Sequence, residues 1–107
     1  MNLEQEREHL RVGSNDEVCG YLATKIRHFR RESKESQEVF ARRVGVPLRT
    51  YKRFETHGNA NLTTFIQILR AIERTQYLFM LFPQEMARSI KPSLDERLMQ
   101  VAKKKSM

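Results

Sequence analysis

Large apolar residues recur every three or four positions through most of this 107-residue chain. Val18, Leu22, Ile26 and Phe29 show the pattern first, at steps of four, four and three. This spacing places them on one face of a helix, because an α-helix makes one turn in about 3.6 residues. No stretch alternates apolar and polar residues as a half-buried strand does, and the short apolar run at 77–82 is not assigned by periodicity alone. The pattern therefore predicts an all-α protein.

Polar residues with helix-capping side chains mark where the helices begin. Ser14 and Glu17 form a capping box ahead of the first helix, and Ser36 and Asn61 precede the second and the fourth. Gly45 ends the second helix, because glycine tolerates the left-handed conformation that is common just beyond a helix C-terminus.

The third helix is expected to begin at Pro47 or Leu48 and to run to Glu55. Proline suits the start of a helix, because the first turn does not use the N–H that proline lacks. Tyr51 and Phe54 lie three residues apart and are predicted to face inward.

A fifth, short helix is expected from Thr75, which can cap it, to Pro83, which ends it. The apolar positions assigned to the second helix are Val39, Phe40 and Val44. Those of the fourth helix are Leu62, Phe65, Ile66, Leu69 and Ile72, and those of the fifth are Leu78, Leu81 and Phe82. Ala41 is small enough to let another helix approach the second one.

The two ends of the chain differ from the middle. Residues 1–13 are polar and acidic with no clear apolar face, which fits a frayed N-terminal arm or a short extra helix. Residues 93–96 form a second capping box ahead of an amphipathic helix and a lysine-rich tail. That helix either packs back onto its own domain or forms an interface with another subunit or a partner protein. The predicted organisation is an arm at 1–13, a helical domain at 14–83, and a C-terminal helix with a basic tail at 84–107.

The chain is strongly basic, and the excess charge is concentrated in one region. Lys and Arg number 20 against 13 Asp and Glu, for a formal net charge of +7. Residues 25–57 alone carry ten cations against four acids. This imbalance implies attraction to a polyanion, either nucleic acid or an anionic surface.

Features of enzymes, metal sites and secreted proteins were not found in the sequence. It contains no glycine-rich phosphate loop, no nucleophile-elbow motif and no paired carboxylates in an apolar setting, so we expect neither catalysis nor a cofactor. The three histidines lack partners at ligand spacing, which argues against a metal site. The single cysteine, the absence of an apolar leader and the short longest apolar run lead us to expect a cytoplasmic protein that does not span a membrane.

The second and third helices carry a spaced motif in the middle of the basic region. It reads Ser36-Gln37-x-x-Phe40-Ala41-x-x-x-Gly45-Val46-x-x-x-Thr50-x-x-x-Phe54-Glu55, followed by Gly58 and Asn61-Leu62-x-x-Phe65. This series resembles the Cro/C1-type (xenobiotic-response-element) helix-turn-helix family of phage repressors and bacterial regulators, over residues 20–82 or so. The resemblance implies a five-helix, lambda-repressor-like domain in which the third helix lies in the major groove of DNA.

The resemblance also implies a set of DNA-contacting residues. Gln37 matches the position that contacts a phosphate in the family, and Leu48, Arg49 and Arg53 match positions that meet base edges. Arg49 and Arg53 lie four residues apart on one helix face, and each guanidinium can bond guanine O6 and N7 together. The residues suited to phosphate oxygens are Thr50, Lys52, Asn59 and Asn61.

This sequence departs from the family pattern around the third helix. Pro47 stands where a polar capping residue is usual. The first turn of the third helix, and the DNA contacts that the resemblance assigns to it, can therefore be displaced. Tyr51 occupies a position that is usually a smaller aliphatic residue, and Thr56-His57-Gly58 replaces the more common turn.

The leading hypothesis is a sequence-specific transcriptional regulator, acting as a repressor that binds a palindromic operator in double-stranded DNA as a homodimer. The alternative is an antitoxin similar to HipB-type proteins, which would bind its operator and, through its termini, a toxin. A weaker third hypothesis is an amphipathic protein of the membrane surface.

Overall fold

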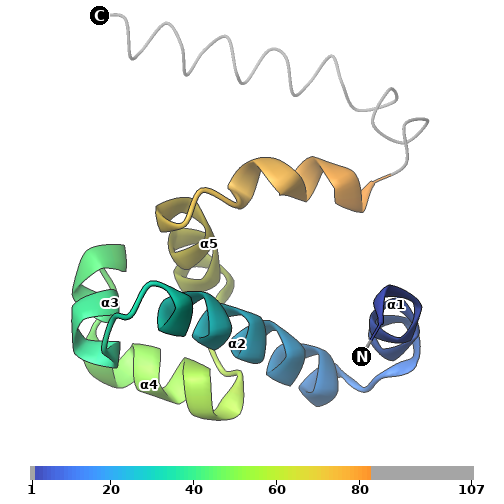
Figure 1. Cartoon of the computed structure of the whole chain (residues 1–107), viewed down its shortest axis with the longest axis horizontal. Helices are drawn as coiled ribbons and strands as arrows, with labels where there is room; N and C mark the ends of the chain where they lie inside the picture. Colours follow the sequence, from blue (N-terminus) through green and yellow to red (C-terminus); the bar gives the residue numbers. More distant parts are fainter. Residues whose placement is uncertain (1, 83–107) are drawn as a thin grey trace, which may run out of the picture. The chain divides into compact units, whose positions relative to one another are not determined.

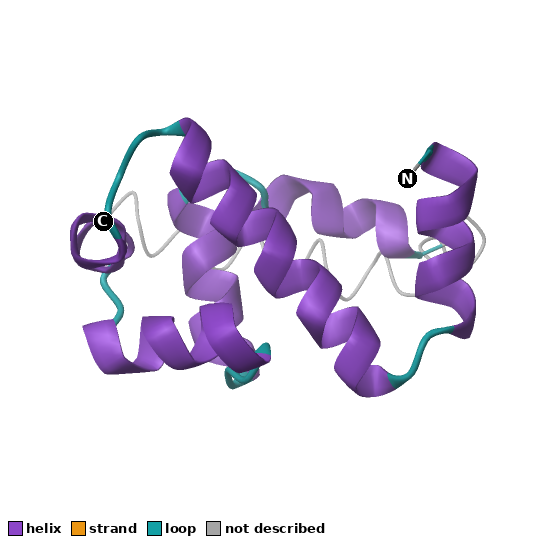
Figure 2. Ribbon diagram, turned by 60° about the horizontal axis from the view of Figure 1, so that its bottom comes forward, coloured by secondary structure: helices purple, strands orange, loops and turns teal. Residues whose placement is uncertain are grey.

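Five α-helices and one 3₁₀-helix follow one another through residues 2–82, the part of the chain that the computed structural model describes. They are α1 (Leu3–Val12), α2 (Asn15–Glu32), α3 (Gln37–Val44), α4 (Leu48–His57), α5 (Leu62–Ala71) and the 3₁₀-helix η1 (Thr75–Leu81). No strand occurs in these residues (Figure 2), so the predicted all-α class is confirmed for them. The predicted C-terminal helix and basic tail at 84–107 lie outside the described residues.

The helices begin where the capping side chains predict. The Ser14 hydroxyl accepts from the Glu17 backbone N–H at 3.1 Å, and the Glu17 carboxylate accepts from the Ser14 N–H at 3.3 Å. Ser36 and Asn61 each accept the backbone N–H three residues further on, at 3.1 and 2.7 Å. These bonds satisfy N–H groups that the first turn of a helix leaves without an internal partner.

The N-terminal residues form a helix, so the interpretation of 1–13 as a frayed arm is wrong and the short extra helix is correct. Asn2 and Gln5 form a capping box at its start, and this spacing was a visible signal in the sequence. Glu6 on this helix lies 2.6 Å from the ammonium group of Lys25 on α2. The two helices are therefore joined by an ion pair as well as by the chain.

The core forms where α4 packs against both α2 and α3 and where α5 packs against α3 (Figure 1). The buried apolar residues are Ala23, Ile26, Phe40, Ala41, Val44, Val46, Tyr51, Phe54, Ile68 and Ile72. Tyr51 lies at the centre, with its ring 5.2 Å from that of Phe40 and 6.3 Å from that of Phe54. This aromatic residue, larger than the family pattern has at that position, is accommodated as a core residue.

Five apolar assignments were wrong, and one buried residue was missed. Among the residues assigned to the fifth helix, Leu78, Leu81 and Phe82 are 37%, 69% and 54% exposed. Val39 is 48% exposed, because it precedes Phe40 by one residue and so points about 100° away from it. Leu62 belongs to the predicted apolar face of α5 but is 73% exposed. Periodicity gives the direction of a side chain but not how far the neighbouring helix extends. Ile68 was not assigned to the core, and it is fully buried.

The predicted fifth, short helix is present and is a 3₁₀-helix. It begins at Thr75, as expected, and ends at Leu81. The chain divides into two compact units, and the first of them ends at Thr75. No helix among the described residues is long and apolar enough to cross a membrane.

Gly58 sits where α4 ends against α2, and its lack of a side chain is required there. Its φ of 72° is a left-handed conformation that side chains disfavour. A Cβ at this position would lie 2.9 Å from the backbone carbonyl carbon of Cys19 on α2. The close approach of α4 and α2 therefore depends on glycine at the C-terminus of α4.

We expect Gly58→Ala to lower the free energy of unfolding by about 1–3 kcal/mol, because it adds both backbone strain and a clash with backbone atoms. The matched control is Gly20→Ala within α2, where an added Cβ meets nothing within 4 Å. That change should stabilise the protein by about 0.5–1 kcal/mol through helix propensity. Urea denaturation measures both values, and equal effects of the two substitutions would contradict the role of Gly58.

Candidate nucleic-acid interface

A tight turn joins α3 to α4, and α5 holds it in place. Gly45 ends α3 with a φ of 75°, as predicted for the residue after a helix. The side-chain amide of Gln67, on α5, donates to the carbonyl oxygens of Val44 and Gly45 at 3.0 and 2.7 Å. The turn is thus held in place by α5, a contact that was not predicted from the sequence.

Helix α4 begins at Leu48, directly after Pro47. The Pro47 carbonyl accepts the Tyr51 N–H at 2.9 Å, so the first turn is regular despite the proline. Proline offers no side-chain cap, and no acidic residue lies in this turn. The first backbone N–H groups of α4 therefore keep the partial positive charge of a helix N-terminus.

The buried and exposed sides of α4 separate as predicted. Tyr51 is fully buried and Phe54 is 2% exposed. Arg49 and Arg53 are exposed, because a helix places them on the face opposite Tyr51. The cations of α4 are therefore held outward by the packing of its aromatic residues.

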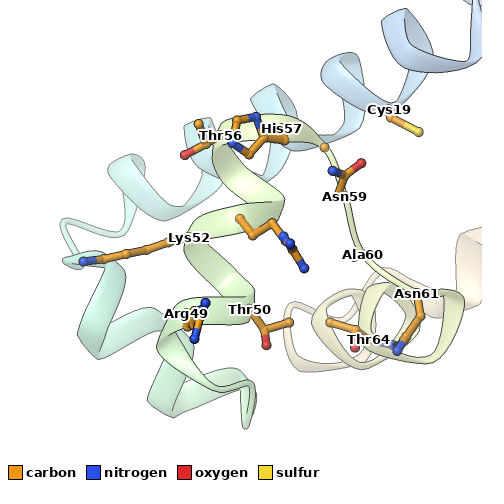
Figure 3. Close-up of a pocket in the computed structure, with 12 residues that line it drawn as sticks. Cys19, Arg49, Thr50, Lys52, Thr56, His57, Asn59, Ala60, Asn61 and Thr64 are labelled. Atoms are coloured by element: carbon orange, nitrogen blue, oxygen red, sulfur yellow. Dashed lines mark hydrogen bonds between the residues drawn. The ribbon is translucent and has the colours of Figure 1, made fainter.

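A hollow of about 1010 Å³ runs from the exposed side of α4 to the start of α5 (Figure 3). We call it the basic hollow. The predicted site residues that line it are Arg49, Thr50, Lys52, Arg53, Asn59 and Asn61. No carboxylate lines the hollow, and no acid among residues 2–82 lies within ion-pair distance of its arginines or its lysine. The site therefore has an uncompensated positive charge.

The side chains of the basic hollow differ in direction. Figure 3 shows Thr50 on the side of α4 that faces Asn61 and Thr64, and Lys52 extending away from them. The Asn61 side-chain oxygen accepts the Thr64 N–H at 2.7 Å, so its NH₂ group is the part left to meet a ligand. Hydrogen-bond donors of α4 and of the residues at the start of α5 thus line the basic hollow.

The other two predicted site residues lie outside this hollow. The Gln37 amide, at the start of α3, donates to the Glu55 carboxylate at 3.3 Å. Leu48 is half-buried and packs against the core, so only part of its side chain faces outward. Neither residue lies among the cations of the basic hollow.

A buried ion pair between Arg30 and Glu55 lies beneath α4, and it was not predicted from the sequence. Arg30 donates through Nε and Nη2 to the two carboxylate oxygens of Glu55, both at 2.8 Å. The two side chains are only 11% and 3% exposed. The signal was present, because Arg30 continues the spacing of Ala23 and Ile26 on the buried face of α2.

The ion pair sets the protonation of the groups around it. Burial raises the pKa of Glu55, but hydrogen bonds from Arg30 and from neighbouring groups outweigh burial and lower it below its ordinary value of 4.5. Burial, together with the adjacent Glu55 carboxylate, raises the pKa of Tyr51. Glu55 is therefore charged and Tyr51 neutral at physiological pH.

The three histidines lie apart from one another. His9 packs near the ring of Tyr21, and His28 lies 2.9 Å from the carboxylate of Glu32. His57 ends α4 and lines the basic hollow. Within residues 2–82, no group of three His, Cys, Asp or Glu side chains could hold a metal ion.

Comparisons with protein-family models, with curated proteins and with solved structures returned no match to this chain.

We expect Glu55→Gln to lower the free energy of unfolding at neutral pH by about 3 kcal/mol, because it leaves the Arg30 charge buried without its partner. The folded pKa of Glu55 lies below its unfolded value, so the wild type should lose this stabilisation as pH falls below about 4.5. The variant should lack that part of the pH dependence. Urea denaturation across pH measures both effects.

The control is Glu32→Gln, which removes an exposed carboxylate from α2. We expect it to change stability by less than about 0.5 kcal/mol. Similar losses for the two variants would show that the Arg30–Glu55 pair does not act as a buried ion pair.

Proposed function

We propose that this chain is a sequence-specific DNA-binding protein of the Cro/C1 helix-turn-helix type, and that it regulates transcription by occluding the DNA it binds. The observation that carries the proposal is the basic hollow. Its arginines and lysine project from one helix, no acid lines it, and amide donors from the start of α5 complete it. Such a face suits a duplex, which presents phosphates on either side of a groove with readable base edges.

Capture by the phosphates is the first step. The formal net charge of +7 attracts a polyanion, and the uncompensated cations of α4 concentrate that attraction on one face. Lys52 extends away from α5, toward where one flank of the groove would lie. Asn59 and the NH₂ group of Asn61 meet the other flank.

Readout of bases is the second step. The major groove is wide enough to admit an α-helix, and Arg49 and Arg53 lie one turn apart on the exposed side of α4. Each can make a bidentate bond to guanine O6 and N7. The exposed part of Leu48 can pack on a thymine methyl group at the start of the helix.

Binding as a homodimer to a palindromic operator fits this mechanism. One recognition helix reads only a few base pairs, and a two-fold pair of subunits doubles the site. The dimer contact that the sequence suggests, in the C-terminal helix, lies outside the described residues.

We expect Arg49→Ala and Arg53→Ala each to weaken binding to the operator by about 1–3 kcal/mol and to relax the base preference, since each removes a bidentate base contact. Lys52→Ala should weaken operator and random DNA alike, because a phosphate contact carries no sequence information. Selection from a random duplex pool defines the operator, and fluorescence anisotropy measures the affinities.

Arg70→Ala is the charge-matched control. Arg70 is an exposed cation at the end of α5 that does not line the basic hollow. It should reduce affinity only slightly through the net charge. Failure of the wild type to bind any duplex would overturn the proposed function, and equal losses on operator and random DNA for the arginine variants would overturn the assigned base contacts.

A further inference from the structure

A second hollow, of about 530 Å³, contains two arginines that take part neither in the buried ion pair nor in the proposed DNA contacts. It is lined by Arg27, Arg30, Arg31, Gln37, Glu55 and Thr56. We call it the arginine hollow. Arg27 is half-buried and Arg31 exposed, and they lie one turn apart on α2.

The charges of the arginine hollow do not cancel. Arg30 and Glu55 neutralise each other through two hydrogen bonds of 2.8 Å, and a third Arg30 nitrogen donates to the Glu35 carbonyl oxygen. No carboxylate among residues 2–82 lies within ion-pair distance of Arg27 or Arg31. The hollow therefore keeps both of their charges.

This arrangement costs stability in the free protein. Arg27 and Arg31 occupy positions i and i+4 of a helix, where like charges repel each other. An acid at either position would instead attract the remaining arginine. Other cations of the described chain do have acidic partners, such as Lys25 with Glu6 and Arg43 with Glu35. A pair of arginines without an acid beside a polar recess is suited to an external anion, and guanidinium groups bind phosphate oxygens through paired N–H donors.

The arginine hollow adjoins the basic hollow. Thr56, in the last turn of α4, lines both of them. The Gln37 amide at the start of α3 also lines the arginine hollow, where it donates to Glu55. A duplex lying along the exposed side of α4 would carry its backbone past Thr56 toward α2.

We propose that Arg27 and Arg31 bind a backbone phosphate of the same DNA duplex, beyond the groove that α4 reads. The inference rests on the proposed function and extends its contact surface to α2. Glu55 does not repel the phosphate, because Arg30 already holds both of its carboxylate oxygens. Thr56 and Gln37 supply neutral donors at the edge of the site.

The test is the salt dependence of DNA binding by the double variant Arg27→Gln, Arg31→Gln in the full chain. Each neutralised phosphate contributes about 0.9 to the slope of log affinity against log salt, so loss of the one phosphate contact should make the slope shallower by about 0.9. Between about 50 and about 200 mM salt, the wild type should then lose about 3.5-fold more affinity than the variant. Operator and random duplexes should respond alike.

Arg7→Gln, Arg70→Gln is the matched control, because it removes the same charge from two exposed positions outside both hollows. A slope for the Arg27, Arg31 variant equal to that of this control, with operator binding intact, would overturn the α2 contact and leave the proposed function standing. Loss of all DNA binding by the wild type would overturn both.

A second measurement separates sources of phosphate. The side-chain ¹⁵Nε resonances of Arg27 and Arg31 should shift on adding duplex DNA and not on adding inorganic phosphate at the same ionic strength. Shifts with inorganic phosphate or with anionic phospholipid vesicles, and none with duplex, would overturn the proposal.

Discussion

The Arg30–Glu55 ion pair is the interaction on which the arrangement of the other helices depends. It joins the C-terminal part of α2 to α4 through two short hydrogen bonds, and through the Glu35 carbonyl oxygen and Gln37 it also reaches the segment that begins α3. Burying two charges is favourable only when their hydrogen bonds are satisfied, so the pair tolerates few alternative geometries. It therefore favours one orientation of α4 over others that would bury Tyr51 and Phe54 equally well.

The same pair determines which charges face outward. By neutralising Glu55 inside the molecule, Arg30 removes the only carboxylate of α4 from the exposed surface, and the remaining charged groups of that helix are cations. The aromatic contacts of Tyr51 act in the same direction, because they fix the rotation of α4 about its axis. The electrostatic character of the outer face is thus a consequence of the packing of the inner face.

Helix capping and turn chemistry predicted where α2 to α5 begin and where α3 and α4 end to within one or two residues, because these signals act within single helices. They could not predict the contacts between helices. The roles of Arg30 and Gln67 depend on partners 25 and 22 residues away, and the exposure of Leu62 depends on where a neighbouring helix ends. For the candidate site, the family resemblance predicted which residues of α4 face outward. The neutralisation of Glu55 by Arg30, and the arginine hollow on which the proposed contact of α2 rests, could be found only in the structure.

The brace from Gln67 has a mechanical consequence. Its two hydrogen bonds occupy carbonyl oxygens on both sides of the bend between α3 and α4, which would otherwise be the natural hinge of the unit. These bonds tie the bend to α5 and oppose a change of the angle between α3 and α4. Under the proposed function, the duplex would have to adjust to the protein, so sequences that bend or twist at low energetic cost would be favoured at base pairs that no side chain touches.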